Sequence, residues 1–217
     1  INLADGQLID YFNGKRDLNK GVLKALPFFD EDPLRIYRTC RFASQYGFDI
    51  EQKTIQIIKE NKKYLSGVKA ERVFDEIEKA ISLSSKPALF FRILDELDLL
   101  EVHFPYIKQM QGIPQPPKYH PEGSVFEHSL QTLNEMARFT DSNELLFASL
   151  LHDIGKIDTP QNILPSHYKH HNCGLKTIKK VYNKLDLPNS YKKVTEEGIR
   201  LHGKLHHIQD MRIGSLY

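Results

Sequence analysis

The chain has 217 residues, 40% of them hydrophobic and 27% charged, and its formal net charge is only +2 with the histidines neutral. These values are typical of a globular protein with a real core, and they exclude a chain that would bind nucleic acid through net charge alone. No apolar run is long enough to span a bilayer and we recognise no signal peptide, so we expect a cytoplasmic protein without a membrane partner. Cys40 and Cys173 lie far apart, which favours a reducing compartment over a disulfide framework.

Residues 1–29 show little periodicity in their hydrophobic residues and contain several turn signals. Residues 6–12 alternate weakly, as a strand does, and Asn13-Gly14 is a strong turn signal. We expect two small strands, or one strand and a short helix, at the edge of a domain that lies upstream. The chain begins with Ile1 rather than Met and ends in a segment without a stop signal, which predicts a piece of a longer protein.

From Asp30 onward the pattern is helical. Asp32 is the expected N-cap, Pro33 the first helical residue, and Gly47 the end of that helix. Further helices are predicted over residues 51–64, 70–81, 88–100, 123–139, 143–154, 170–185 and 189–203. Residues 82–87 are predicted to form a linker and the proline-rich residues 105–123 a loop. The predicted fold class is therefore mainly α.

A row of arginines follows Asp32 on the first long helix. Arg35, Arg38 and Arg41 recur every three residues and form a slowly rotating stripe, with Asp32 one turn before Arg35. A carboxylate that accepts and a guanidinium that donates form a set of groups able to read a nucleobase edge, with the further arginines on phosphates. The alternative is a surface helix that Asp32 caps while it pairs with Arg35, and from the residues alone this alternative is favoured.

A second charged segment runs from Glu71 to Lys79. Its glutamates and lysines are most simply a solvated helix face with pairs at helical spacing. We therefore expect a structural role for it.

The most informative stretch is the apolar run 145–151, which is followed at once by His152, Asp153, Gly155 and Lys156. Such a helix belongs in a core, and a core rarely accepts an imidazole, a carboxylate and an ammonium group unless they are paired or bind a metal. The alternative is a polar helix end, with Gly155 as the C-cap and Lys156 near the negative end of the helix dipole.

Other histidines strengthen the metal hypothesis. His128 lies on the preceding predicted helix, which can bring it beside His152 and Asp153, and His170, His202 and His206 are candidates to complete the shell. Imidazole and carboxylate ligands suit divalent transition metals better than calcium, and Lys156 would add positive charge for a phosphoryl oxygen. The histidines expected to be merely exposed are His167, His171 and His207.

These motifs together resemble a known family. The segments Tyr119-His-Pro-Glu-Gly-Ser-Val-Phe-Glu-His128 and Leu150-Leu-His-Asp-Ile-Gly-Lys156 resemble the HD superfamily of metal-dependent phosphohydrolases, in the version fused to bacterial CCA-adding tRNA nucleotidyltransferases. Those enzymes also carry upstream motifs similar to Glu31-Asp32-x-x-Arg35-x-x-Arg38-x-x-Arg41-Phe42 and to Glu71-Arg72-x-x-x-Glu76-x-x-Lys79.

The resemblance implies a domain plan. Residues 1–29 would be the trailing edge of an α/β nucleotidyltransferase head, 30–87 a helical neck that selects the base and binds RNA, and 88–217 a helical body with an HD domain, truncated at its C-terminus. In the neck Asp32, Arg35 and Arg38 would bind the base of CTP or ATP, while Glu71 and Arg72 would support the fold. The implied partners are tRNA and nucleotides, for a monomer or homodimer.

The resemblance also implies the chemistry. Mg²⁺ would serve the transfer of CMP and AMP to tRNA 3′ ends, and Mg²⁺, Mn²⁺ or Ni²⁺ would occupy the HD site. The predicted metal ligands are His128, His152, Asp153, His170 and His202, and the predicted catalytic residues are His152, Asp153 and Lys156. The Gly-rich turn and paired carboxylates of the head are not found, so this chain by itself is not expected to transfer nucleotides. The last Asp of the typical HD shell is expected beyond Tyr217, because Asp210 follows His206 too closely.

Two alternatives stay open. One is a stand-alone HD-type phosphohydrolase that acts on nucleotides or cyclic phosphates. The other is a non-enzymatic RNA-binding scaffold with a relict metal site, in which lysines follow the phosphates. The candidate lysines are Lys59, Lys62, Lys63, Lys69, Lys176, Lys179, Lys180, Lys184, Lys192 and Lys193.

Overall fold

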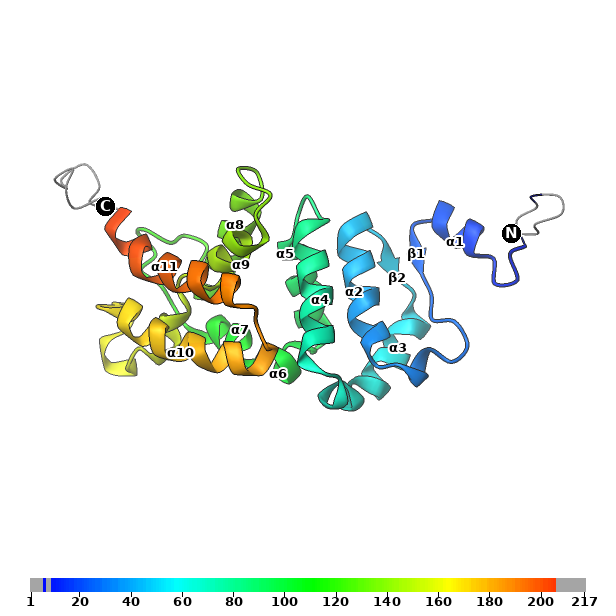
Figure 1. The fold of residues 1–217 in the computed structure, drawn as a ribbon, viewed down its shortest axis with the longest axis horizontal. Coiled ribbons are helices and arrows are strands. Elements are labelled where there is room, and N and C mark those ends of the chain that lie inside the picture. Colours follow the sequence, from blue (N-terminus) through cyan, green and yellow to red (C-terminus); the bar gives the residue numbers. More distant parts are fainter. Residues whose placement is uncertain (1–5, 7–8, 206–217) are drawn as a thin grey trace.

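The computed structural model describes residue 6 and residues 9–205, and helices follow one another along an elongated molecule (Figure 1). The N-terminal half comprises α1 (Gly14–Asn19), β1 (Val22–Leu23), η1 (Phe29–Glu31), α2 (Leu34–Tyr46), β2 (Asp49–Ile50), α3 (Gln52–Asn61), η2 (Lys62–Gly67) and α4 (Ala70–Ser82). The C-terminal half comprises α5 (Ala88–Glu96), α6 (Leu100–His103), α7 (Pro105–Gln109), η3 (Met110–Gly112), α8 (Val125–Met136), α9 (Asn143–Leu151), η4 (Ile154–Asp158), η5 (Gln161–Ile163), α10 (His170–Leu185) and α11 (Asn189–Leu205). The mainly α prediction is confirmed.

The N-terminal segment differs from the predicted strand. Its described residues up to Phe12 form no strand; instead the Asp10 carboxylate accepts hydrogen bonds from the backbone N–H groups of Gly14 and Lys15, at 2.7 and 2.9 Å, and fixes the first turn of α1. The predicted short helix is therefore present. The expected strand is also present, but as β1 at Val22–Leu23 rather than at residues 6–12; it pairs in parallel with β2, and both strands are too short to leave a sequence pattern.

Helix α2 starts and stops close to the predicted positions. The N-cap is Pro33 rather than Asp32, so the helix begins one residue later than predicted; Asp32, just before the cap, still accepts from the backbone N–H of Leu34 through Oδ1 at 3.1 Å. Gly47 ends the helix in the left-handed region, at φ 65°, where a side chain would be strained.

The proline-rich segment is the main correction to the predicted fold. Residues 105–109 form α7 and residues 110–112 form η3, where a loop was predicted. Pro105 occupies the first turn, in which its missing N–H costs nothing, and Ile107 and Met110 are buried in the core. Only the remainder, residues 113–124, is a loop.

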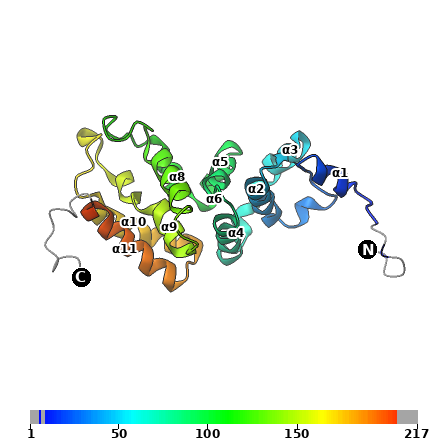
Figure 2. The ribbon, with the colours of Figure 1, turned by 90° about the horizontal axis from the view of Figure 1, so that it is seen from above.

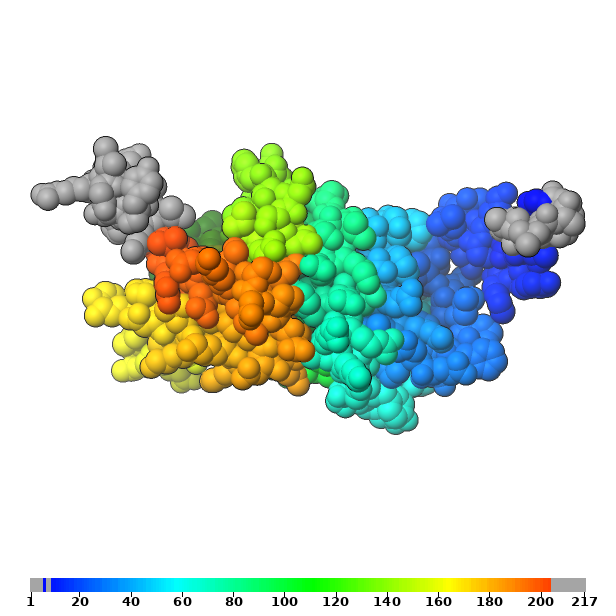
Figure 3. Space-filling view, in the orientation of Figure 1, coloured from blue at the N-terminus to red at the C-terminus, as the bar shows by residue number. Residues whose placement is uncertain are grey.

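One hydrophobic core runs through both halves. At the junction Phe74 of α4, Phe147 of α9 and Tyr191 of α11 meet edge to face, with ring centroids 4.9–6.0 Å apart. Seen from above, α4 lies between α2 and the helices α8–α11 (Figure 2), and the surfaces of successive elements abut along the long axis (Figure 3). No described helix is both long and apolar enough to cross a bilayer.

Candidate metal centre and neck pocket

Helix α9 delivers His152 and Asp153 into the interior. Every residue from Leu146 to Leu151 is buried, as the apolar run predicts. Immediately after the helix, the His152 Nδ1 lies 2.7 Å from the Ser149 carbonyl oxygen, and the Asp153 side chain is only 2% exposed. A carboxylate is therefore held where water hardly reaches it, which is costly unless positive charge or a metal compensates.

Two glycines bring α10 against this turn. A Cβ on Gly155 would lie 2.0 Å from the His170 carbonyl oxygen and 2.4 Å from the Gly174 backbone nitrogen, so only glycine fits at position 155. The close backbone approach places His170, at the start of α10, beside Asp153. Gly155 is thus a packing residue of η4 and not the C-cap of α9, which rejects the polar helix end as an explanation of this glycine.

Four imidazoles converge on the two oxygens of Asp153. Oδ2 lies 3.2 Å from His152 Nε2 and 3.7 Å from His128 Nε2. Oδ1 lies 3.1 Å from His170 Nε2 and 3.3 Å from His202 Nε2. The structure therefore brings together all five residues that the sequence predicts as metal ligands, from α8, α9, α10 and α11.

The outer nitrogens of these rings all face acceptors. His152 Nδ1 faces the Ser149 carbonyl, His170 Nδ1 the His167 carbonyl at 2.8 Å, His202 Nδ1 the Ile199 carbonyl at 2.9 Å, and His128 Nδ1 the Glu122 carboxylate at 2.7 Å. Each Nδ1 must carry a proton to make these bonds, so in the neutral rings the lone pairs of all four Nε2 atoms point inward.

A cluster of inward acceptors calls for a cation. His170 Nε2 and His202 Nε2 lie 2.8 Å apart, although in each neutral ring the proton is on Nδ1. Asp153 Oδ1 is buried and receives no well-formed hydrogen bond from any described residue. Imidazole nitrogens around one carboxylate are ligands of divalent transition metals, and outer hydrogen bonds of this kind orient metal-bound histidines. The residues present therefore fit a divalent metal.

The Asp153 carboxyl is ionised whether or not a metal is bound. Burial alone would raise its pKa, but without a metal the charge of His152 and hydrogen bonds from His152, His170 and His202, which these rings donate only when Nε2 is protonated, hold that pKa well below its usual range. Burial, together with nearby His152, lowers the pKa of His128. A charged carboxylate and a neutral imidazole are the forms that bind metal.

Lys156 is buried beside the carboxylate rather than free. Its Nζ donates to Asp153 Oδ2 at 2.7 Å and to Gln115 Oε1 at 2.6 Å. The ammonium group therefore neutralises part of the Asp153 charge, and one of its three protons remains for another acceptor.

Sequence reasoning missed several residues around the centre. Gln115 and Glu122 lie in the proline-rich loop, where no periodic pattern marks them. His167, expected to be exposed, is half-buried: its Nδ1 lies 2.8 Å from Thr159 Oγ1 and its Nε2 2.9 Å from the Pro114 carbonyl oxygen. His171 is also half-buried. His206, His207 and Asp210, for which predictions were made above, lie outside the described residues.

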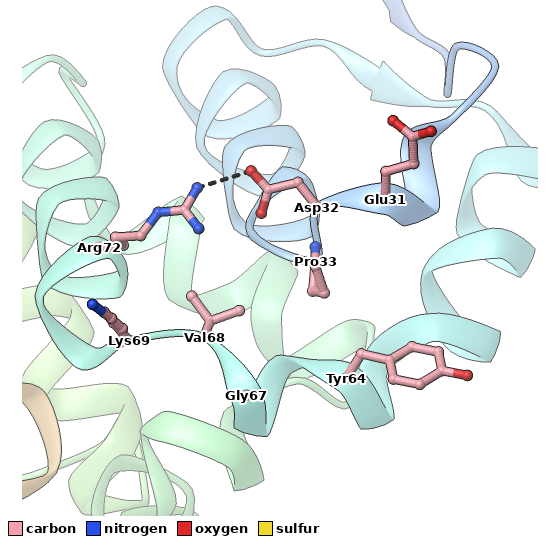
Figure 4. A pocket seen from close by; sticks show the side chains of 8 residues that line it. All are labelled: Glu31, Asp32, Pro33, Tyr64, Gly67, Val68, Lys69 and Arg72. Carbon is pink, nitrogen blue, oxygen red and sulfur yellow. Dashed lines mark hydrogen bonds and ion pairs between the residues drawn. The ribbon is translucent and has the colours of Figure 1, made fainter.

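A second site is the pocket on the N-terminal half shown in Figure 4. It has a volume of about 670 Å³ and opens between the start of α2, η2 and the start of α4. Its lining consists of Glu31, Asp32, Pro33, Tyr64, Gly67, Val68, Lys69 and Arg72. Asp32 Oδ2 accepts from Arg72 at 2.8 Å, so the partner of Asp32 is Arg72 and not Arg35, as the simple surface-helix interpretation expected.

The three arginines that follow Asp32 on α2 have different surroundings. Arg35 donates to the Phe28 carbonyl oxygen, Arg38 is exposed, and the described pocket lining includes neither. Arg41 is buried and its Nε donates to Glu76 Oε2 at 2.7 Å. The expectation that the further arginines reach phosphates is therefore wrong for Arg41, and Glu76 is not on a solvated face. Base binding by Arg35 and Arg38 stays a prediction.

Comparisons with known proteins assign two parts of the chain to families. Residues 47–111 match the family described as "Probable RNA and SrmB-binding site of polymerase A", and residues 125–214 match the HD domain family. The "Multifunctional CCA protein" of Haemophilus influenzae (strain PittGG) is 36% identical over 220 residues, covering 96% of this chain and 53% of the relative. That of Thioalkalivibrio sulfidiphilus (strain HL-EbGR7) is 37% identical over 213 residues, covering 95% and 52%.

Solved structures support the fold. The Thermotoga maritima CCA-adding enzyme complexed with tRNA aligns with a TM-score of 0.58 at 19% identity, over 93% of this chain and 44% of that chain. A CCA-adding enzyme with ATP aligns with a TM-score of 0.55 at 19% identity, over 94% and 44%.

A segment that matches a polymerase RNA-binding family is therefore followed by a segment that matches the HD domain family and contains the convergent histidine cluster. Over almost its whole length the chain is similar to bacterial multifunctional CCA proteins. It spans about half the length of the curated relatives it matches.

Proposed function

We propose that this chain is the base-selecting and tRNA-binding part of an enzyme that adds CMP and AMP to tRNA 3′ ends. The observation that carries the proposal is the similarity to multifunctional CCA proteins over almost the whole chain. CTP, ATP and tRNA are the substrates, and Mg²⁺ is the metal of the transfer step. We expect the protein to act in the cytoplasm as a monomer or homodimer.

In this proposal the pocket of Figure 4 selects the base. Asp32 offers carboxylate lone pairs and the neighbouring Arg72 offers N–H donors, so the two side chains together match a base edge that has both donors and acceptors. Burial by itself would raise the pKa of Asp32. The hydrogen bonds from Arg72 and from the backbone N–H of Leu34 outweigh that effect, so the pKa of Asp32 is lowered and the side chain accepts as a carboxylate. Arg35 and Arg38 are proposed to approach the nucleotide from the same end of α2.

The test measures CTP and ATP incorporation into tRNA that lacks its 3′ end, by the protein at its natural length. Asp32→Ala is expected to reduce discrimination between the two nucleotides by about 5–150-fold, since one good base contact contributes about 1–3 kcal/mol. Asp30→Ala is the matched control, because Asp30 is exposed nearby and outside the pocket lining. Unchanged affinity and unchanged base choice in Asp32→Ala would reject this role.

We also propose a metal-dependent phosphohydrolase activity, favoured by the convergence of four imidazoles on Asp153. His128, His152, Asp153, His170 and His202 would hold Mg²⁺, Mn²⁺ or Ni²⁺. When bound, such a metal polarises a phosphoryl oxygen and lowers the pKa of a bound water. Lys156 would hold its ammonium group toward the same centre.

This second activity is tested on the purified chain with nucleotides that carry cyclic or terminal phosphates. With at least one of the three metals we expect release of phosphate from the terminal monoester, or opening of the cyclic phosphate to a monoester, and neither product after His152→Ala or Asp153→Ala. Absence of turnover with all three metals would reject the activity for this chain. Salt-sensitive tRNA binding without turnover would instead favour the scaffold reading, in which Lys62 is a weak candidate because it already pairs with Asp98 at 2.5 Å.

A further inference from the structure

The loop of residues 113–124 is a folded segment that touches the metal centre. It is closed by the backbone bridge between Pro114 and Ser124, and the Gln115 N–H donates to the Gly123 carbonyl oxygen at 3.0 Å. His167 joins the same loop to the segment before α10 through the Pro114 carbonyl oxygen. The loop therefore has a fixed shape beside the histidine cluster.

Glu122 is the loop residue that reaches a metal-ligand candidate. Its Oε1 lies 2.7 Å from His128 Nδ1 and 3.0 Å from His120 Nδ1, and its side chain is only 10% exposed. The rings of His120 and His128 pack edge to face, 4.7 Å between centroids. One carboxylate oxygen thus receives two imidazole N–H groups in a confined place.

His120, Glu122 and His128 differ from the cluster around Asp153 in their balance of hydrogen-bond donors and acceptors. His120, Glu122 and His128 could be taken for another metal site, because their ligand atoms lie close together. Here, however, two imidazole N–H groups meet a carboxylate, which is a complete set of hydrogen bonds without a metal. Around Asp153, by contrast, imidazole lone pairs face each other and the carboxylate.

We infer that Glu122, held in place by His120, is a positioning residue for His128: it binds the Nδ1 proton and thereby directs the Nε2 lone pair toward Asp153. The inference rests on the proposed metal centre. A carboxylate behind a metal-bound histidine fixes the tautomer and ring orientation and makes the ligand more basic, and losing such a group typically lowers metal affinity about 10–100-fold.

The first measurement is Mn²⁺ and Ni²⁺ binding to the purified chain by calorimetry. Glu122→Ala is expected to weaken binding about 10–100-fold. Glu122→Gln, whose amide oxygen still accepts the Nδ1 proton, is expected to recover part of that loss. Glu135→Ala is the control, because Glu135 is an exposed carboxylate on the same helix as His128.

The second measurement needs no metal and reports on the tautomer directly. Imidazole ¹⁵N shifts of the metal-free chain are expected to show His128 protonated at Nδ1, and Glu122→Ala to move part of the population to the Nε2-protonated form. His120→Ala is expected to give a smaller change, because Glu122 keeps its bond to His128.

The outcomes separate the inference from the metal centre itself. If the native chain binds neither metal, the proposed centre fails, whereas the tautomer measurement still tests the contact. If the native chain binds metal and Glu122→Ala leaves both affinity and tautomer unchanged, the positioning role is wrong. Equal losses of affinity in Glu122→Ala and Glu122→Gln with an unchanged tautomer would make Glu122 a ligand instead, which also overturns it.

Discussion

The two candidate sites differ in how far their acceptors are matched by donors and cations. In the neck pocket Asp32 has a cationic partner, Arg72, and both side chains are partly exposed. In the metal centre Asp153 Oδ2 also has a cationic partner, Lys156, but the carboxylate is buried among four imidazoles whose lone pairs point inward as well. One cation matches the single carboxylate of the first site, whereas the inward acceptors of the second outnumber its one ammonium group and would be matched by a further cation. Unmatched acceptors are therefore the more specific structural signal of a ligand.

The largest effect on the metal centre is expected from a substitution that moves α10 away from Asp153. In Gly155→Ala the new Cβ would collide with backbone atoms of His170 and Gly174, which cannot yield as a flexible side chain does. We expect the free energy of unfolding to fall by about 3 kcal/mol, together with loss of metal binding. Urea denaturation measures the first effect. Gly112→Ala is the control, since a Cβ there meets open space; equal stability of the two variants would contradict the packing account.

Removing the charge at the centre tests whether it needs a cation. Asp153→Asn keeps the shape but replaces one anionic oxygen with an amide, so we expect Mn²⁺ affinity to fall by more than about 100-fold, beyond the loss typical of an outer residue. Calorimetric titration measures it. Asp32→Asn in the neck pocket should leave the same titration unchanged, and if both substitutions weakened metal binding equally, the distinction between the sites would not hold.

A buried histidine of α6 offers a contrast with the metal centre, because its ring is paired without a cation. His103 Nδ1 pairs with the Tyr37 hydroxyl at 2.9 Å, and burial lowers the pKa of His103 to about 4. The unfolded chain binds this proton near its ordinary pKa of about 6.5, so stability is lost as the pH falls from there toward 4.

We expect His103 to contribute a loss of about 2 kcal/mol between pH 7 and pH 4.5. The measurement is urea unfolding at a series of pH values, native chain against His103→Gln, whose side chain can still pair with Tyr37. The variant should show a shallower decline. Parallel curves would mean that His103 protonates equally in the folded and unfolded chain.

The smallest effect on stability is expected from breaking the ion pair between Arg72 and Asp32. The Arg72 side chain is half exposed, so Arg72→Ala should lower the free energy of unfolding by less than about 1 kcal/mol. Its effect should appear in base choice during nucleotide incorporation. A large loss of stability in Arg72→Ala, compared with Lys69→Ala in the same pocket, would show that the pair serves the fold rather than the nucleotide.

Much of the fold and of the ligand set could be predicted from local pattern. The apolar run before His152 predicted a buried helix, Asp32 and Gly47 marked the ends of α2, and the residue types at 128, 152 and 153 predicted a metal site. The helical structure of residues 105–112 was not predicted because proline suggested a loop, although proline is well suited to a first helical turn. The pairing of Asp32 with Arg72 was not predicted because the two residues are forty positions apart, and the spacing of residues on one helix gives no information about such a contact.

Helical periodicity, capping and ligand chemistry are local properties, so most of the helices and the side chains able to bind a metal can be recognised in the sequence alone. The contacts of Arg72 with Asp32, of Arg41 with Glu76 and of Glu122 with His128 appear only in the folded chain. These pairings depend on how close two backbones approach, as Gly155 and Gly174 do at the metal centre. That approach is set by packing between distant segments, which no short stretch of sequence records.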